Sequence, residues 1–465
     1  MIFLSVHGHF YQPRRDDPAT GEIPEEYGAA PFSNFNQKIL AECYAPNARE
    51  RNYERLSFDF GPTLLSWMKR EDPALHRQIA AADRASARRF GSGGAMAQSY
   101  HHSILPLATR AEKELEIAWG LQDFESRFGR RAQGLWLPEA GVDLETLAVA
   151  AEQGVEYTIL APWQAAVRGL DPTRPYWVEL PGGRQMAVFF FLRSLSGRLS
   201  FNPQISIDAD AFARDHLGPI ANLLRQEGGP RLLLLATDGE LYGHHQPGRE
   251  KFLRRLLRTS AARVGFTVTH PGQFLDLYPP EHSIPLVERS SWSCHHGIER
   301  WATTCPCTPE AHWKAPLRQA FERLAVDLDA AYTEAASAWT DRPRELLLAS
   351  IEVVLGRRPL SKLAAEFTRR PLGRADLGRL SELLWAQRLR HRMFSSCGWF
   401  WSDLDRIEPR NCLKAAAAAV VKTRNVTGSD PAPWLADELA QLKDPNTDMT
   451  AEAVVREEWE RLGYA

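Results

Sequence analysis

The stretch Gly-Leu-Trp-Leu-Pro-Glu-Ala-Gly at residues 134–141 decides the fold, and the rest of the chain can be interpreted from it. Residues 135–137 are an apolar run typical of a buried strand. Pro138 marks the end of that strand, because proline has no N–H to donate to a sheet ladder. Glu139 therefore lies at the open end of the structure that buries this strand.

A second stretch has the same form. Residues 231–235 are largely apolar, and Thr-Asp-Gly-Glu-Leu-Tyr-Gly-His-His follows at 237–245, so that Asp238 also comes at a strand end. Two buried strands that each deliver a carboxylate are what a two-carboxylate enzyme needs. Because Glu139 and Asp238 are 99 residues apart (238 minus 139), only tertiary structure can bring them together.

Seven short strands alternate with helices, which is typical of βα units around a parallel sheet. The expected strands are residues 2–6, 56–60, 91–100, 135–137, 157–161, 186–192 and 231–236. Polar or aromatic side chains follow most of them: His7, His9, His102, Glu139, Trp163, Arg193 and Asp238. An open doubly wound sheet would usually place function in one crevice. Polar groups after at least five strands favour a closed barrel, whose active site lies at the C-terminal strand ends.

The last third of the chain is predicted to be helical. Apolar residues recur there at helical spacing: Trp313, Leu317, Phe321, Leu324, Leu328 and Tyr332. Further helices are expected over residues 344–355, 376–393 and 413–423. We therefore predict a catalytic barrel over residues 1–285, and a connecting loop with a C-terminal helical domain packed on the barrel over residues 286–465.

Composition limits the classes of function. The 465 residues are 44% hydrophobic and 25% charged, which is ordinary for a globular protein. The net charge of −2 lacks the basic excess of a nucleic-acid binder. No apolar run approaches the ~20 residues of a membrane span, and residues 1–6 are too short for a signal sequence. We expect a cytoplasmic protein, and the oligomeric state stays open.

For several candidate residues, another role or another residue competes with the functional assignment. His7 and His9 occupy alternate positions of an extended segment, so both rings point to one face, where a functional role competes with core packing. Glu240 shares the strand face of Asp238, so the two could exchange roles. Of the adjacent pair His244 and His245, we expect only one, His245, to contact substrate.

Three motifs together resemble glycoside hydrolase family 57: His-Gly-His-Phe-Tyr-Gln-Pro at 7–13, Trp-Leu-Pro-Glu at 136–139 and Thr-Asp-Gly-Glu at 237–240. The resemblance covers most of residues 1–300. It implies a (β/α)7 barrel and retaining chemistry on α-glucans without a cofactor or catalytic metal. It also implies that Glu139 is the nucleophile and Asp238 the general acid/base.

The same resemblance suggests which residues hold the sugar. It implies that His7 and His9 bind the sugar at the cleavage point, and it adds His102, although other members have a glutamate-containing motif there. Ser-Ser-Cys-Gly-Trp-Phe-Trp at 395–401 resembles a helical extension of one uncharacterised branch. The candidate stacking platforms are Trp136, Trp163, Trp292, Trp399 and Trp401. For each of them stacking competes with a role in core packing, which we favour for Trp136.

Six cysteines do not suggest a disulfide framework. Cys294, Cys305 and Cys307, with His295 and His296 between them and Cys397 as a possible fourth thiol, could bind a metal. Structural zinc ligands usually come in pairs two to four residues apart, and Cys-Pro-Cys is tighter. We therefore favour unligated thiols and expect no metal.

Two other functions stay open. A metal-dependent carbohydrate deacetylase or mannosidase-like barrel also begins with His-x-His, but residues 10–13 supply no carboxylate ligand. A non-catalytic sugar-binding barrel is the third possibility, and the presence of both carboxylates argues against it. The sequence does not distinguish hydrolysis from glucan transfer or branching.

Overall fold

The computed structural model describes residues 1–18 and 20–464, which form two compact units. The first unit comprises residues 1–12, 25–100 and 109–293, and the second comprises residues 13–24, 101–108 and 294–465. The second unit therefore takes two short segments from the N-terminal part of the chain. No helix among the described residues is long and apolar enough to cross a membrane.

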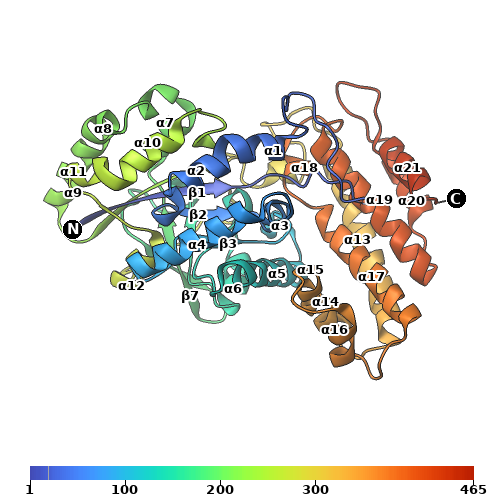
Figure 1. Ribbon diagram of the computed structural model, residues 1–465. Coiled ribbons are helices and arrows are strands. Elements are labelled where there is room, and N and C mark those ends of the chain that lie inside the picture. Colours follow the sequence, from blue (N-terminus) through green and yellow to red (C-terminus); the bar gives the residue numbers. More distant parts are fainter. Residues whose placement is uncertain (19, 465) are drawn as a thin grey trace. The chain divides into compact units, whose positions relative to one another are not determined.

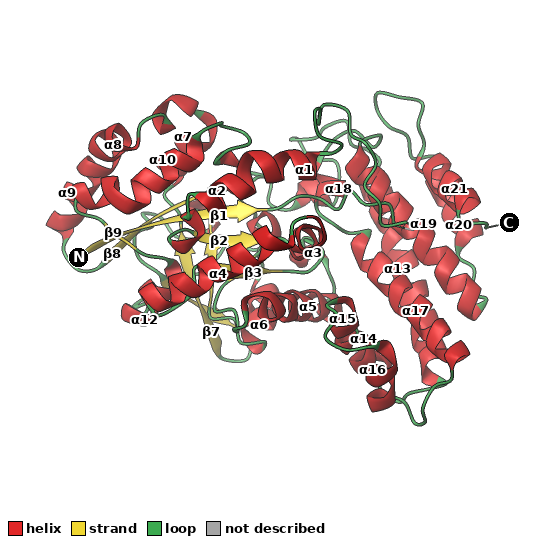
Figure 2. Ribbon diagram, in the orientation of Figure 1, coloured by secondary structure: helices red, strands yellow, loops and turns green. Residues whose placement is uncertain are grey.

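The first unit is built on parallel strands, drawn as yellow arrows in Figure 2. Their bounds are β1 (Ile2–Phe10), β2 (Ser57–Phe60), β3 (Ala95–Gln98), β4 (Leu135–Trp136), β5 (Tyr157–Leu160), β7 (Arg184–Phe190) and β8 (Arg231–Asp238). One run of neighbours is β4-β3-β2-β1-β8, and β5 pairs in parallel with β7.

Two short connections join these runs into a ring. Gly134 bridges Tyr157 in parallel, which joins β4 to β5. The Leu192 N–H donates to the Leu234 carbonyl at 2.8 Å, which joins the end of β7 to β8. The expected (β/α)7 barrel is thus confirmed, and the C-terminal ends of its seven parallel strands lie at one rim.

Two strands lie outside the ring. β6 (Tyr176–Leu180) pairs antiparallel with β7, and β9 (Thr267–Val268) pairs with the beginning of β1. We did not expect β6 from the sequence. The signal was present, because β6 and β7 are joined through Gly182 and Gly183, which both have positive φ, as a tight hairpin turn requires.

Helices flank the strands of the first unit (Figure 1). Their bounds are α1 (Phe35–Ile39), α2 (Ala45–Arg49), α3 (Pro62–Glu71), α4 (Pro73–Phe90), α5 (Arg110–Phe128), α6 (Leu144–Glu152), α7 (Arg193–Phe201), α8 (Ala209–Phe212), α9 (Gly218–Glu227), α10 (Arg249–Arg255), α11 (Ala261–Arg263) and α12 (Pro271–Leu277). α6, which follows the Glu139 motif, begins at Leu144 because the Asp143 side chain caps it by accepting from the Thr146 N–H at 2.7 Å.

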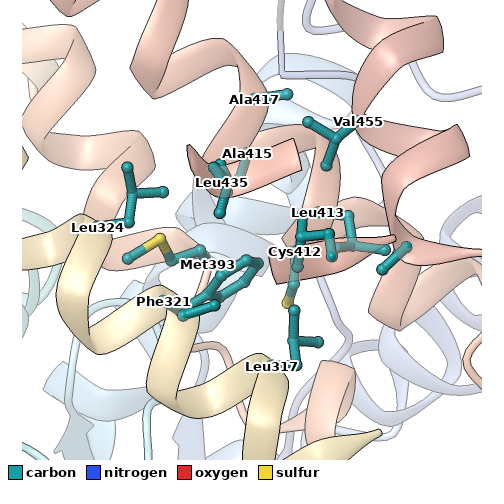
Figure 3. Packing of buried hydrophobic residues seen from close by; sticks show 14 of the residues in the cluster. Leu317, Phe321, Leu324, Met393, Cys412, Leu413, Ala415, Ala417, Leu435 and Val455 are labelled. Carbon is teal, nitrogen blue, oxygen red and sulfur yellow. The ribbon is translucent and has the colours of Figure 1, made fainter. Parts of the chain in front are cut away.

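The second unit is helical, as expected. Its helices are α13 (Lys314–Ser337), α14 (Pro343–Ala349), α15 (Ile351–Val354), α16 (Leu360–Phe367), α17 (Arg374–Arg392), α18 (Cys397–Phe400), α19 (Ile407–Thr427), α20 (Ala432–Leu439) and α21 (Ala451–Arg461). Their shared core includes Leu317, Phe321 and Leu324 from α13, with Met393 and Leu413 (Figure 3). The predicted apolar stripe is therefore the buried face of α13.

Candidate active site

Glu139 projects from a strained turn at the end of β4. Pro138–Ala140 forms a single 3-10 turn in which Glu139 has φ 56° and Ala140 has φ 47°. Left-handed backbone is rare outside glycine, and it recurs at functional sites where the surrounding structure holds it in place. Here the backbone N–H of Trp292 donates to the backbone carbonyl of Glu139 at 3.0 Å, which holds the turn in place.

The Glu139 carboxylate is partly exposed and accepts two side-chain hydrogen bonds. The Ser293 hydroxyl donates to Oε2 at 2.6 Å and the Trp292 indole N–H donates to the same oxygen at 3.2 Å. Burial raises the pKa of Glu139, and the negative charge of Asp238 raises it further. The two hydrogen bonds and the charge of His9 act in the opposite direction.

Asp238 is the last residue of β8 and is exposed, whereas the rest of that strand is buried. In the strand register it lies opposite His9 of β1. The next residue, Gly239, must be glycine because a Cβ there would come within 2.3 Å of the Phe10 ring. Only glycine therefore allows the chain to turn over β1 directly after Asp238.

Glu240 has a different environment from Asp238. It is buried, and the Tyr44 hydroxyl donates to its Oε1 at 2.6 Å. Burial raises the pKa of Glu240 to about 7, with a further contribution from the charge of Asp238. Of the two carboxylates that the sequence could not distinguish, the exposed one is Asp238.

A network of buried polar groups lies beside these carboxylates. Asp59 on β2 accepts from His7 Nε2 through Oδ1 and from His9 Nδ1 through Oδ2, both at 2.8 Å. Gln98 Nε2 also donates to Asp59, and Ser57 Oγ lies 2.9 Å from His7 Nδ1. Asp59 therefore holds both histidine rings in position through its two carboxylate oxygens.

The two histidines differ in charge. Burial lowers the pKa of His7. Burial also acts to lower the pKa of His9, but Asp59, Asp238 and Glu240 outweigh it and raise that pKa to about 9. His9 is therefore cationic at neutral pH, and it lies among four carboxylates when Glu139 is included.

Aromatic rings pack around the histidines. Trp136 is fully buried and stacks on both His7 and His9, with ring centroids 4.8 and 5.0 Å apart. Trp292 meets Trp136 edge-on at 4.9 Å. Trp163 is partly exposed at the end of β5, and the Arg193 guanidinium covers one of its faces at 5.1 Å.

The adjacent histidines after β8 have separate surroundings. His244 Nδ1 lies 2.6 Å from Glu42 Oε2, which gives His244 a structural partner. His245 is exposed and its ring interacts electrostatically with Asp238. The arrangement is consistent with the expectation that only His245 is available to substrate.

Three expected site residues belong to the second unit. His102 is buried, with Nδ1 2.7 Å from Ser396 Oγ. Trp399 is 1% exposed, packs in the helical core and donates its indole N–H to the Met393 carbonyl at 3.2 Å. Its ring faces are therefore occupied by core contacts rather than available to a sugar. Trp401 is 40% exposed and keeps an accessible ring, with Arg406 over it at 4.2 Å.

Some residues of the site were absent from our sequence analysis. Asp59 was missed although it is the lone acid in a short buried strand, and a buried carboxylate must have partners. That rule could have identified it. Gln98 and Ser293 carry no comparable signal in the sequence.

Comparison with known families gives two matches. The model described as "Glycosyl hydrolase family 57" matches residues 6–287. A domain of unknown function (DUF3536) matches residues 310–454. A search of curated protein sequences finds no significant match.

Solved structures with the same fold have low sequence identity. A maltose-forming amylase from Pyrococcus sp. ST04 has a TM-score of 0.76 at 16% identity, over 94% of this chain and 82% of that one. A branching enzyme from Pyrococcus horikoshii has a TM-score of 0.64 at 16% identity, over 99% and 94%. A 4-alpha-glucanotransferase from Thermococcus litoralis has a TM-score of 0.55 at 15% identity, over 90% and 58%.

Proposed function

Because the chain belongs to glycosyl hydrolase family 57, we propose that it is a retaining enzyme that cleaves α-1,4-glucans and passes the glycosyl group to water or to another sugar. In this proposal Glu139 is the nucleophile and Asp238 is the general acid/base. The observation that carries it is geometric: Glu139 follows β4 and Asp238 ends β8, so two carboxyls 99 residues apart in sequence lie at the same rim of the barrel.

The first half of the reaction makes opposite demands on the two carboxyls. Asp238 must be protonated to give its proton to the glycosidic oxygen while that bond breaks, and Glu139 must be ionised to bond to the anomeric carbon. The cationic His9 and the Ser293 hydroxyl both lower the pKa of Glu139. They therefore favour the carboxylate form that attacks, and His9 acts here as a positioning and charge-balancing residue.

The second half reverses the proton transfer. Asp238, now a carboxylate, takes a proton from water or from a sugar hydroxyl, whose oxygen bonds to the anomeric carbon as the bond to Glu139 breaks. Two inversions at one carbon give net retention. The exposure of Asp238 supports this role, because the residue that serves the acceptor must be reachable from solvent.

The substrate class is proposed from the similar structures, which are named as a maltose-forming amylase, a branching enzyme and a glucanotransferase. His7 and His9 are proposed to hold the sugar at the cleavage point, with His245 and Trp163 as further contacts. Trp401, in the second unit, is proposed as a separate sugar contact. His102 and Trp399 are buried and are proposed to support the fold instead. A cytoplasmic location is part of the proposal, and cell fractionation would test it.

Incubation with amylose and with short maltooligosaccharides tests the activity. New chain lengths, or new branch points, would distinguish hydrolysis, transfer and branching, and proton NMR of the first products should show retention of the anomeric configuration. Glu139→Gln and Asp238→Asn should each abolish turnover without loss of fold. If Glu240→Gln abolished turnover while Asp238→Asn did not, the acid/base role would belong to Glu240.

A further inference from the structure

The loop at the start of the second unit gathers four soft metal ligands. They are Cys294, His296, Cys305 and Cys307, and their ligand atoms all lie within 4.8 Å of one another. It is the one such group of His, Cys, Asp and Glu side chains found among the described residues. The sequence alone favours unligated thiols here, with Cys397 as a possible fourth thiol, but in the structure the fourth potential ligand is His296.

The distances within the group match a tetrahedron of ligands. Cys294 Sγ lies 3.6 Å from Cys305 Sγ and 3.9 Å from Cys307 Sγ. His296 Nδ1 lies 3.8, 3.4 and 3.5 Å from the sulfurs of Cys294, Cys305 and Cys307. A zinc ion with Zn–S bonds of about 2.3 Å and a Zn–N bond of about 2.0–2.1 Å has S–S edges of about 3.8 Å and S–N edges of about 3.6 Å.

The same distances exclude a simpler explanation. A disulfide between Cys294 and Cys305 would bring the sulfurs to about 2.05 Å, well short of the separation observed. Three thiols and an imidazole at these spacings share the centre of one small polyhedron. The set of three sulfurs and one nitrogen suits Zn²⁺, and four protein ligands leave no open coordination position, which is typical of a structural rather than a catalytic site.

The surroundings also suit a bound cation with thiolate ligands. A Zn²⁺ ion with three thiolates and a neutral imidazole has a net charge of −1. Lys314 is fully buried, and although burial lowers its pKa to about 7, Cys305 and Cys294 act to keep its amine charged. Its ammonium donates to the Arg300 carbonyl at 2.8 Å and to Thr308 Oγ1 at 3.3 Å, so it is held beside the site.

The segment that carries the ligands has little regular structure of its own. Between Cys294 and the start of α13 at Lys314 it contains one 3-10 turn, Glu299–Trp301. Ile298 and Trp301 from this segment are nonetheless fully buried in the helical core. A loop of this length needs a constraint to hold such side chains in place, and a metal that ties its two ends together supplies one.

We propose that these four residues form a structural zinc site that fixes the 294–313 loop on the helical core of the second unit. The ligand pairs Cys-x-His and Cys-x-Cys are closer in sequence than the usual two- to four-residue spacing. The proposal does not depend on the proposed enzyme activity, because none of the four ligands takes part in it.

Metal analysis of the full-length protein tests the proposal. Protein purified without a metal-affinity tag and dialysed should contain about one zinc per chain, as for a closed four-ligand site. A thiol-blocking mercurial should release that zinc into a colorimetric chelator, a measurement that needs no variant to fold. Cobalt loaded in its place should show the visible bands of tetrahedral thiolate coordination.

Matched variants test the ligand assignment. We expect loss of zinc and a lower unfolding temperature in His296→Ala and in Cys305→Ser. We expect the zinc content and the unfolding temperature of the wild type in His295→Ala and in Cys397→Ser. Folded wild-type protein with less than about a tenth of an equivalent of any transition metal would overturn the proposal. Equal zinc in His296→Ala and His295→Ala would overturn the role of His296.

Discussion

Replacement of Asp59 by asparagine tests how the site controls its charge. The pKa of His9 is about 9 instead of 6.5, a difference of about 2.5 pH units, or about 3.4 kcal/mol favouring the charged ring. Burial opposes this and Asp59 is the largest favourable contribution. Without that carboxylate the pKa of His9 should fall by about 2 pH units, a typical effect of one opposite charge.

The sign of the effect on stability follows. A histidine whose pKa is raised on folding contributes stability that is complete below pH 6.5 and is lost as the pH rises through about 9. As the pH rises from 7 to 8.5, loss of the proton from His9 should lower the free energy of unfolding of the wild type by about 2 kcal/mol. In Asp59→Asn that decline should be nearly absent, because His9 is then neutral across most of the same interval.

The assay is NMR of protein labelled with ¹³C at histidine Cε1, titrated from pH 5 to 10, with the His9 resonance identified by its loss in His9→Gln. Asp123→Asn is the matched control, since Asp123 is a buried carboxylate of the same unit paired with Arg127 rather than with a site histidine. A wild-type midpoint near 6.5, or the same midpoint in Asp59→Asn as in the wild type, would refute the reasoning.

Three further predictions concern other parts of the molecule. Ser293→Ala removes a hydrogen bond that lowers the pKa of the proposed nucleophile, so the acid limb of kcat/KM should move up by about 1 pH unit, and an unchanged limb would contradict this. Gly120→Ala places a Cβ 1.9 Å from a backbone carbonyl oxygen of β3, so thermal unfolding should show a loss of about 1–3 kcal/mol in the free energy of unfolding. Gly197 has open space around it, so Gly197→Ala should lower the stability far less. Trp399→Ala should lower the free energy of unfolding by about 3–5 kcal/mol, measured by chemical unfolding, because it empties a core position. Trp401→Ala should alter product lengths rather than stability. The reverse pattern would be inconsistent with the burial of the two rings.

Much of the fold could be predicted because local sequence carries its signals. An apolar run that ends at Pro138 predicts a buried strand and places Glu139 at its end, wherever the strand lies in the sheet. The stripe from Trp313 to Tyr332 predicts which face of α13 is buried, because the helical repeat alone decides which residues share a face.

Tertiary structure decided which groups meet. Asp59 and His9 are 50 residues apart, and only the register of β2 against β1 places the carboxylate beside both histidines. Cys294 and Cys307 come together through the path of an irregular loop, whose course no periodicity encodes. Periodicity reports which face of an element is buried, whereas charges, pKa values and ligand sets depend on distances between elements, and those distances exist only in the folded chain.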